Sequence, residues 1–263
     1  MASNPVKMLF HAGLFLRVIF VWLAVGVVTV WWCGLIIICS PVVHLFDKKA
    51  RFLHTLSVLW GRSVVLVLPN LRYTVKGKEN IMPNGNGVIY VANHQSQLDI
   101  LALFILGPHF RWLAKQSLFM IPIFGWALKL SGNVSVIRND RKSRAKCMED
   151  ARKIIERGIS MVFFPEGTRS LDGVLKSFKL GAFSLAKDTG VPIVPVTIVG
   201  ADAFLPKGSI VPKGNRFDII VHPRIEVAER TVLQLSNLAR EAIASALPPE
   251  KRGAVVMSVG KDE

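Results

Sequence analysis

The chain has 263 residues, of which 51% are hydrophobic, with a formal net charge of +15 and a mean hydropathy of +0.41. This combination argues against an ordinary soluble enzyme and is typical of a basic protein that meets an anionic lipid surface or an anionic substrate. Nucleic acid is the usual partner at a pI near 10.1. We expect no nucleic-acid partner, because the sequence has no zinc-ligand spacing, basic zipper or aromatic-basic RNA signature.

The amino-terminal block is strongly apolar. Residues 18–39 contain no charged side chain, and a basic segment, 47–51, follows them. This stretch is long enough to span a bilayer as a helix, and the basic segment predicts that the bulk of the chain lies on the cytoplasmic face. A second apolar segment, 52–68, contains His54 and Arg62 and reads as a half-buried or interfacial helix. The sequence leaves open whether the block spans the membrane or dips into one leaflet as a hairpin.

From residue 70 onward, short apolar runs alternate with helical patterns. This alternation predicts an α/β fold, with a largely parallel sheet flanked by helices on both faces. The expected domains are 1–69, membrane-anchoring helices; 70–247, the α/β domain; and 248–263, a polar tail without order. The expected strands are 71–76, 88–92, 110–114, 133–137, 159–164, 191–199 and 216–222, and the expected helices are 98–106, 142–157, 180–189 and 231–247.

Three expectations are more specific. Residues 115–130 contain Pro122 and Gly125, which predict a broken helix with an exposed apolar surface. The two prolines within 191–199 suggest an edge strand or an irregular start. The helix over 142–157 is expected to bury one face, formed by Ala145, Met148, Ala151 and Ile155.

His94 and Asp99 follow the expected strand at 88–92. Five helical steps put two side chains on nearly opposite faces, so His94 is expected to precede the helix and fold back toward Asp99. The carboxylate then holds one ring nitrogen and leaves the other free as a base. The competing interpretation is structural, because Ser96-x-x-Asp99 is also a helix N-cap signature.

Other polar residues also follow expected strands. In parallel sheets, ligands gather beyond the carboxyl ends of the strands, so these residues are expected to share one site with His94. They are Lys115, Arg138, Glu166, Gly167, Thr168 and Arg169.

Four ordered blocks resemble the glycerolipid acyltransferase family, in particular its lysophosphatidate acyltransferases. They are His94-x4-Asp99, Gly132 with Arg138 six residues on, Phe164 to Ser170, and Val191 to Pro195. The residue before the arginine is often Asp in this family and is Ile137 here. The resemblance implies transfer of a fatty acyl group from acyl-CoA or acyl-carrier protein to the sn-2 hydroxyl of 1-acylglycerol-3-phosphate, giving phosphatidate. It also implies a membrane protein, at the bacterial inner membrane, whose partners are membrane lipids.

The residue chemistry fits this reaction. An acyl thioester is already activated, so an alcohol needs only a base, which is His94, with Asp99 fixing its tautomer. Arg138 and Arg169 offer planar forks for a phosphate, Lys115 a point charge, and Gly167 and Thr168 backbone amides. Glu166 is expected to orient an arginine or bind a glycerol hydroxyl. We expect no cofactor and no metal, since neither His-Glu-x-x-His nor Cys-x-x-Cys occurs.

Two rival interpretations stay open at this point. In the first, the chain is an acyltransferase with the same chemistry but a different acceptor: glycerol-3-phosphate, lyso-ornithine lipid or another lysophospholipid. Alternatively, the chain is a non-catalytic basic protein that holds anionic lipid, although membrane binding alone needs neither His94 nor Asp99.

Overall fold

A computed structural model describes residues 5–253, except 138, 171 and 206–209, and leaves out the side chains of residues 5–12 and 14. Its centre is a seven-stranded sheet with the order β1-β7-β6-β2-β5-β3-β4. The strands are β1 (Arg72–Lys76), β2 (Ile89–Ala92), β3 (Phe110–Lys115), β4 (Val134–Val136), β5 (Ser160–Phe163), β6 (Ile193–Val199) and β7 (Arg216–Val221). Strands β2 to β6 run parallel, and β7, with β1 beside it, runs antiparallel to β6. The expected α/β class is confirmed.

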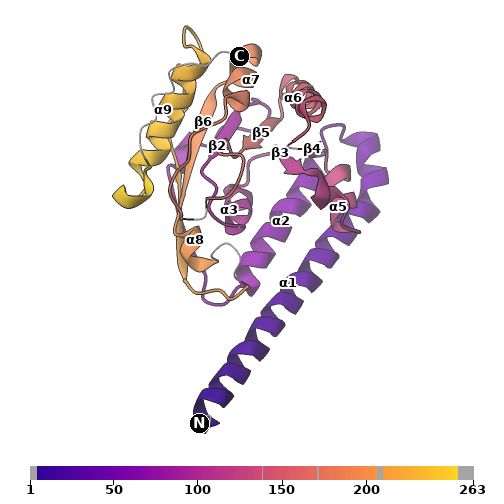
Figure 1. The fold of residues 1–263 in the computed structure, drawn as a ribbon. Coiled ribbons are helices and arrows are strands. Elements are labelled where there is room, and N and C mark those ends of the chain that lie inside the picture. The colour runs from indigo at the N-terminus through magenta and orange to yellow at the C-terminus, as the bar shows by residue number, and fades with distance from the viewer. Residues whose placement is uncertain (1–4, 138, 171, 206–209, 254–263) are drawn as a thin grey trace.

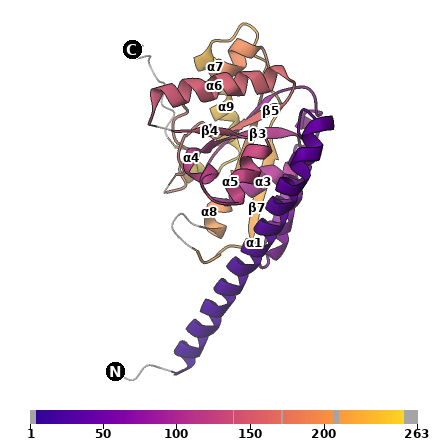
Figure 2. The ribbon, with the colours of Figure 1, turned by 90° about the vertical axis from the view of Figure 1, so that its right-hand side faces the viewer.

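Helices cover both faces of this sheet (Figures 1 and 2). They are α1 (Pro5–Phe46), α2 (Arg51–Val67), α3 (Leu98–Leu106), α4 (Gln116–Phe119), α5 (Phe124–Leu130), α6 (Arg141–Glu156), α7 (Gly181–Thr189), α8 (Ala201–Phe204) and α9 (Val232–Ser245), with short 3-10 turns at η1 (Lys78–Asn80) and η2 (Pro249–Lys251). One core lies between the sheet and α6, α7 and α9. A second lies on the opposite face, under α2, α3 and α8.

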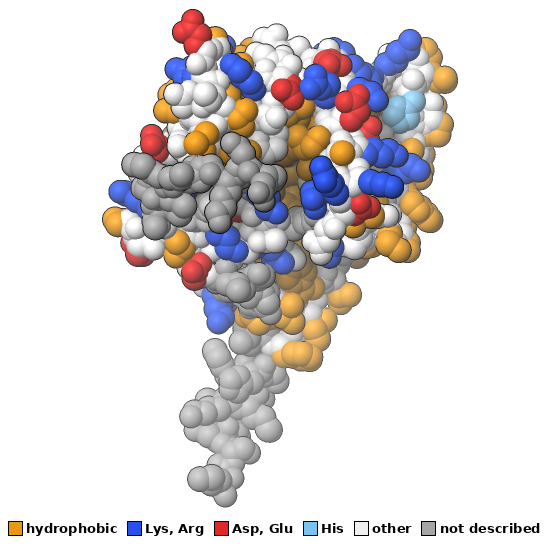
Figure 3. All heavy atoms as spheres, turned by 45° about the horizontal axis from the view of Figure 1, so that its top comes forward, with side chains coloured by type: hydrophobic (Ala, Val, Ile, Leu, Met, Phe, Trp, Pro, Cys, Tyr) orange, Lys and Arg blue, Asp and Glu red, His pale blue; other side chains and the backbone are white. Residues whose placement is uncertain are grey.

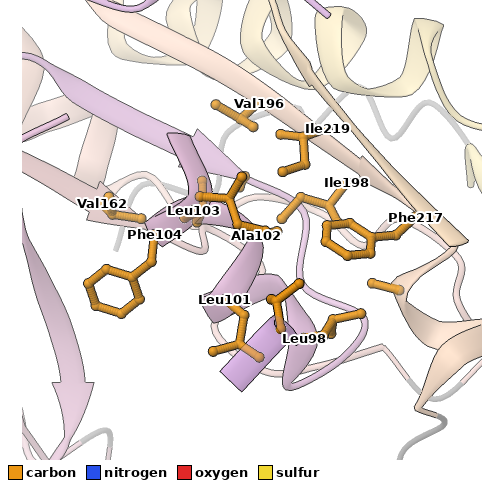
Figure 4. Packing of buried hydrophobic residues seen from close by; sticks show 14 of the residues in the cluster. Leu98, Leu101, Ala102, Leu103, Phe104, Val162, Val196, Ile198, Phe217 and Ile219 are labelled. Carbon is orange, nitrogen blue, oxygen red and sulfur yellow. The ribbon is translucent and has the colours of Figure 1, made fainter. Parts of the chain in front are cut away.

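Helix α3 is held in the second core by its apolar residues. Leu98, Ala102 and Leu103 are at most 2% exposed, and the close-up shows them among side chains of β5, β6 and β7 (Figure 4). Burial of one such leucine contributes about 2 kcal/mol. The helix ends at Gly107, whose φ of 81° is the left-handed conformation that glycine adopts without steric cost. This packing fixes the start of α3, and therefore the turn that precedes it.

Helices α1 and α2 form an antiparallel hairpin beside the sheet (Figure 1). The turn between them is held by Arg111 of β3, whose guanidinium is buried and donates to the carbonyls of Lys49 and Ala50 at 2.7 and 3.2 Å. Two hydrogen bonds join the helices, from Trp32 to Ser63 and from Trp60 to Thr29. A third core lies between the hairpin and α5.

Residues 15–46 of α1 are long and apolar enough to cross a membrane, by length and composition, with a mean hydropathy of 2.3 in the most apolar stretch. Few of their side chains are buried, unlike those of a core helix. Figure 3 shows hydrophobic side chains along the hairpin, whereas Lys and Arg side chains gather over the α/β part. The expected domain boundary at residue 69 stays a prediction.

The buried face of α6 differs from the expected one. Cys147, Ala151 and Ile155, spaced by four residues, are buried against the sheet, whereas Ala145 is exposed and Met148 is half-buried. Ala145 lies about 200° around the helix from Cys147, and therefore faces the solvent. The expected helix is present, but its orientation was partly wrong because the small thiol of Cys147 packs as an apolar side chain.

The prolines of 191–199 do not mark an edge strand. Strand β6 is hydrogen-bonded to β2 on one side and to β7 on the other. Pro192 precedes the strand, as an irregular start requires. Pro195 is tolerated in the interior because its ladder with β7 begins one residue later, at Val196, so the missing N–H falls at the end of the ladder.

The polar tail is partly ordered, contrary to expectation. Residues 249–251 form a 3-10 turn, and the main chain of Lys251 accepts from Leu175 at 2.8 Å. The ammonium of Lys251 pairs with Asp202 at 2.5 Å. These long-range contacts give residues 248–253 a fixed place; residues 254–263 lie outside the described part of the chain.

Candidate active site

The site begins where β2 ends. Asn93, the next residue, is fully buried, and its side-chain amide exchanges two 2.8 Å hydrogen bonds with the main chain of Ile198 in β6. An Asn side chain that satisfies both a donor and an acceptor replaces one step of a β ladder. The chain is therefore fixed at the position where it leaves the sheet, and His94 follows at the carboxyl edge of the parallel strands.

The contact expected between His94 and Asp99 is present. His94 Nδ1 lies 2.9 Å from Asp99 Oδ2, and the His94 side chain is 12% exposed while Asp99 is fully buried. The same Asp99 oxygen accepts from the main-chain amides of Gln95 and Ser96 at 2.7 and 2.8 Å. One carboxylate therefore closes the turn and contacts the imidazole, whereas Gln97, at the N-cap of α3, has no side-chain cap hydrogen bond. The catalytic role of the pair stays a prediction.

Glu166 fastens this turn to the loop after β5. One carboxylate oxygen accepts from the His94 amide at 2.7 Å and the other from the Lys176 amide at 3.1 Å. Burial raises the pKa of Glu166 to about 7, although both hydrogen bonds favour its charged form. Glu166 was expected to orient an arginine or bind a glycerol hydroxyl, but its two oxygens accept from main-chain amides. Its place in the structure is that of a brace between two loops.

Aromatic rings support the imidazole from one side. The ring of Phe164 stacks on His94 with centroids 4.0 Å apart and planes inclined by 14°. Trp112 stacks on Phe164 in turn, at 5.7 Å. Sequence reasoning gave these two residues no role; the signal for Phe164 was its position directly before Pro165 and Glu166. The stack fixes the ring plane of His94, so that Nε2 has a constant direction.

Next to His94 lies an apolar cavity of about 190 Å³. Its wall comes from the hairpin, α3, β3 and the α4–α5 segment, which are far apart in the sequence. The lining side chains are mostly apolar and include Cys33, Ile36, Trp60, Phe104, Leu118, Phe124, Ala127 and Leu128. The size and the apolar lining of this space suit an aliphatic chain, with His94 on its wall.

The remaining predicted residues lie in different places. Lys115 lines the same cavity as His94 and has an exposed side chain. Thr168 is exposed and Arg169 is half-buried, both on the loop after β5. The Gly167 amide donates to Phe164 at 3.0 Å, so it closes a turn and is not available to a phosphate as expected. Arg138 lies outside the described residues.

Two lysines near this loop were missed as site residues. Lys176 donates through its ammonium to the Arg169 carbonyl at 3.2 Å. Lys179 lies over Gly167, where an added Cβ would meet its side chain at 2.8 Å. The sequence feature that could have indicated them is the lysine-rich stretch after Arg169. Its position over the loop was not predictable, because it depends on hydrogen bonds such as that from the Lys179 amide to the Pro165 carbonyl.

A His–Asp pair at the carboxyl edge of a parallel sheet, beside an apolar cavity and cationic side chains, fits an acyltransferase. Residues 72–199 match the family described as Acyltransferase. The crystal structure of the 1-acyl-sn-glycerophosphate acyltransferase from Thermotoga maritima has a TM-score of 0.76 with this chain and 26% identity, covering 87% of this chain and 92% of that one.

Curated relatives agree with that match. A 1-acyl-sn-glycerol-3-phosphate acyltransferase of Chlamydomonas reinhardtii is 41% identical over 82% of this chain, and the chloroplastic enzyme of Arabidopsis thaliana is 39% identical over 88%. The chain spans 65% of the length of each. The Escherichia coli 1-acyl-sn-glycerol-3-phosphate acyltransferase is 34% identical over 65% of this chain and 70% of its own length. The chain belongs to this acyltransferase family.

Proposed function

We propose that the protein is a 1-acyl-sn-glycerol-3-phosphate O-acyltransferase, which transfers a fatty acyl group from acyl-CoA or acyl-carrier protein to the sn-2 hydroxyl of lysophosphatidate and releases phosphatidate. The observation that carries the proposal is the 2.9 Å contact between His94 and Asp99 on the wall of an apolar cavity. The names of the similar proteins, which act on 1-acyl-sn-glycerol-3-phosphate, support the choice of acceptor.

The chemistry follows from the orientation of His94. Asp99 accepts a hydrogen bond from Nδ1–H, which leaves the Nε2 lone pair to take the proton from the sn-2 hydroxyl. The oxygen attacks the thioester carbonyl, the carbon–sulfur bond breaks, and the leaving thiolate receives that proton from the imidazolium. General-base assistance of this kind contributes about 10²- to 10⁴-fold in rate. No cofactor is needed, because the thioester supplies the activated acyl group.

Positive charge at the carboxyl edge of the sheet supports an acceptor that carries a phosphate. Lys115 ends β3, and Arg169, Lys176 and Lys179 lie on the segment that follows β5, at the carboxyl edge where His94 also lies. A phosphate is held best by several charge-assisted hydrogen bonds from such side chains. Arg138, which lies outside the described residues, is assigned to the same role on the sequence resemblance alone.

The place of the protein follows from the hairpin. The apolar helix α1 ends beside the basic residues Lys48, Lys49 and Arg51, which favours a cytoplasmic position for the α/β part. We therefore place the protein on a membrane, with its catalytic part on the cytoplasmic face, as at a bacterial inner membrane. Its partners are membrane lipids, lysophosphatidate and the thioester donor.

The test measures free-thiol release from oleoyl-CoA by the detergent-purified protein, with and without 1-acylglycerol-3-phosphate. We expect release that requires the acceptor and falls about 10²-fold or more in His94→Ala, with phosphatidate as the product. His44→Ala, at an exposed histidine of α1, is the control and should retain activity. Full turnover by His94→Ala would disprove the mechanism. Equal turnover with a lysolipid lacking anionic charge would disprove the acceptor assignment.

A further inference from the structure

A second cleft lies apart from the cavity beside His94. It has a volume of about 440 Å³ and lies between α1, the residues just before β1, and the segment that leads into β7. None of the residues that line it lines the cavity beside His94. The mechanism proposed above leaves this cleft without a role.

Three cations from distant parts of the chain converge on this cleft. They are Arg17 of α1, Arg72 at the start of β1 and Lys213. All three side chains are exposed, and among the described residues no carboxylate lies within ion-pair distance of any of them. Bringing like charges together raises the free energy of the folded chain unless an anion offsets them. Asn70 and Asn215 add side-chain amides, which are further donors for anion oxygens.

An apolar groove adjoins the basic cleft. It is lined by Phe15, Val18, Ile19, Trp22, Leu23 and Ile210, and Val18 lines the cleft and the groove alike. Trp22 donates through its indole nitrogen to the Ile210 carbonyl at 2.7 Å, which fixes α1 against this segment. The groove has a volume of about 500 Å³ and an almost wholly apolar lining. A positively charged cleft that continues into an apolar groove complements a molecule with an anionic head and an aliphatic chain.

The position of the cleft on α1 fits this chemistry. Arg17 immediately precedes the uncharged part of the helix, which runs from Val18 to Phe46. We propose that the cleft and groove together bind one anionic phospholipid, with its phosphate between Arg17, Arg72 and Lys213 and an acyl chain along Trp22 and Ile210. This site is independent of the acyl-transfer reaction.

The experiment titrates the full-length protein in detergent with phosphatidylglycerol and measures retained lipid by native mass spectrometry. Phosphatidylglycerol is chosen because it is neither the substrate nor the product proposed above. Arg17→Gln/Arg72→Gln/Lys213→Gln should weaken its retention about tenfold or more, since one charge-assisted contact is worth about that factor. Phosphatidylcholine with the same acyl chains should be retained weakly by both proteins.

The matched control removes three exposed lysines elsewhere, in Lys78→Gln/Lys153→Gln/Lys187→Gln, which lowers the net charge equally. Retention should remain as in the unmodified protein. Equal loss in both triple variants, or equal retention of the two lipids, overturns the proposal. Displacement of the lipid by low-millimolar inorganic phosphate also overturns it, because the groove would then contribute nothing. Unchanged acyl transfer shows that a variant is folded. If the triple variant at the cleft is not folded, the single variant Lys213→Gln takes its place.

Discussion

The turn at His94 and the docking of the helical hairpin differ in the range of their contacts. The turn is closed by Asp99, five residues from His94, and by the intervening amides. The hairpin is held by Arg111, which reaches the Lys49 carbonyl across 62 residues, and by the close contact of Gly61 with Phe104. The contact between His94 and Asp99 is therefore formed within one local turn, although Glu166 and Phe164 support that turn from afar, whereas the cavity beside His94 exists only after tertiary packing. Variants in the His94 turn should therefore lower mainly kcat, whereas variants at the hairpin contacts should lower mainly the free energy of unfolding.

The largest effect is expected for Asp99→Asn. The amide oxygen of Asn still accepts from the turn, but a neutral side chain no longer stabilises the imidazolium and permits the wrong ring tautomer of His94. We expect kcat to fall about 10²- to 10⁴-fold with little change in KM or in unfolding temperature. Steady-state thiol release and calorimetry in detergent measure the two quantities.

The control for this variant is Asp188→Asn, at a 48% exposed side chain that pairs with Arg152. A surface pair contributes about 0–1 kcal/mol, so neither kcat nor stability should change measurably. If Asp99→Asn lowers the unfolding temperature strongly while the remaining folded fraction turns over normally, Asp99 serves only to close the turn. The prediction that this region affects rate and not stability would then be wrong.

Arg111→Met should have the opposite signature. Methionine has a similar length but leaves the carbonyls of Lys49, Ala50 and Phe110 without their donor. Hydrogen bonds to a charged group are worth about 1.5–3 kcal/mol each, so we expect a loss of about 3–5 kcal/mol in the free energy of unfolding. Burial lowers the pKa of Arg111 to about 10, and this desolvation, which the variant removes, limits the loss.

The measurement for Arg111 is thermal unfolding in detergent, with Arg216→Met as the control at an exposed arginine paired with Asp218. The fraction that stays folded should keep the kcat dependence on pH of the unmodified protein, since His94 is untouched. A changed pH profile with unchanged stability would show that the hairpin and the turn are not separate.

The same difference in range explains what the sequence could predict. The His94 turn was predictable because the residues that form it lie close together in the sequence. Lys115 and Glu166 were predictable as neighbours of His94 because each comes at the end of an expected parallel strand, and these ends share one edge of the sheet. The brace formed by Glu166 and the stack of Phe164 on His94 were not predictable, because they depend on how two loops meet. The exposure of Ala145 and the order of residues 248–253 likewise follow from packing against distant segments.

Glu166 joins the His94 turn to the loop after β5, and its titration tests that brace. Its pKa is about 7 in the folded chain and has the ordinary value of 4.5 when unfolded. Between these values the folded state holds a proton that the unfolded state has released, so stability falls as pH rises from 4.5 to 7. The full difference is about 3 kcal/mol, at 1.36 kcal/mol per pKa unit.

Glu166→Gln should remove this pH dependence, whatever constant cost it adds by placing an amide against the Lys176 N–H. Unfolding free energies at pH 5 and pH 8 are compared for the two proteins, because other groups, such as His109 with its pKa lowered to about 4 by burial, cancel in the difference. Parallel pH curves for the two proteins would show that Glu166 is ionised throughout, and that the brace is not strained by burial.

The smallest effect separates two glycines of the hairpin. At Gly61 of α2, an added Cβ would lie 2.7 Å from the Phe104 Cβ, whereas Gly34 of α1 has nothing within 4 Å. Gly61→Ala should therefore lose about 1–2 kcal/mol by overpacking, after the gain in helix propensity is included. Gly34→Ala should gain up to about 1 kcal/mol in the free energy of unfolding.

Thermal unfolding in detergent measures the stability of both variants. The acyl-chain preference, measured with C12 to C18 thioesters, should shift only for Gly61→Ala, because Phe104 lines the cavity beside His94. If Gly34→Ala destabilised the protein and Gly61→Ala did not, the close contact of the hairpin would lie at α1 and not between α2 and α3.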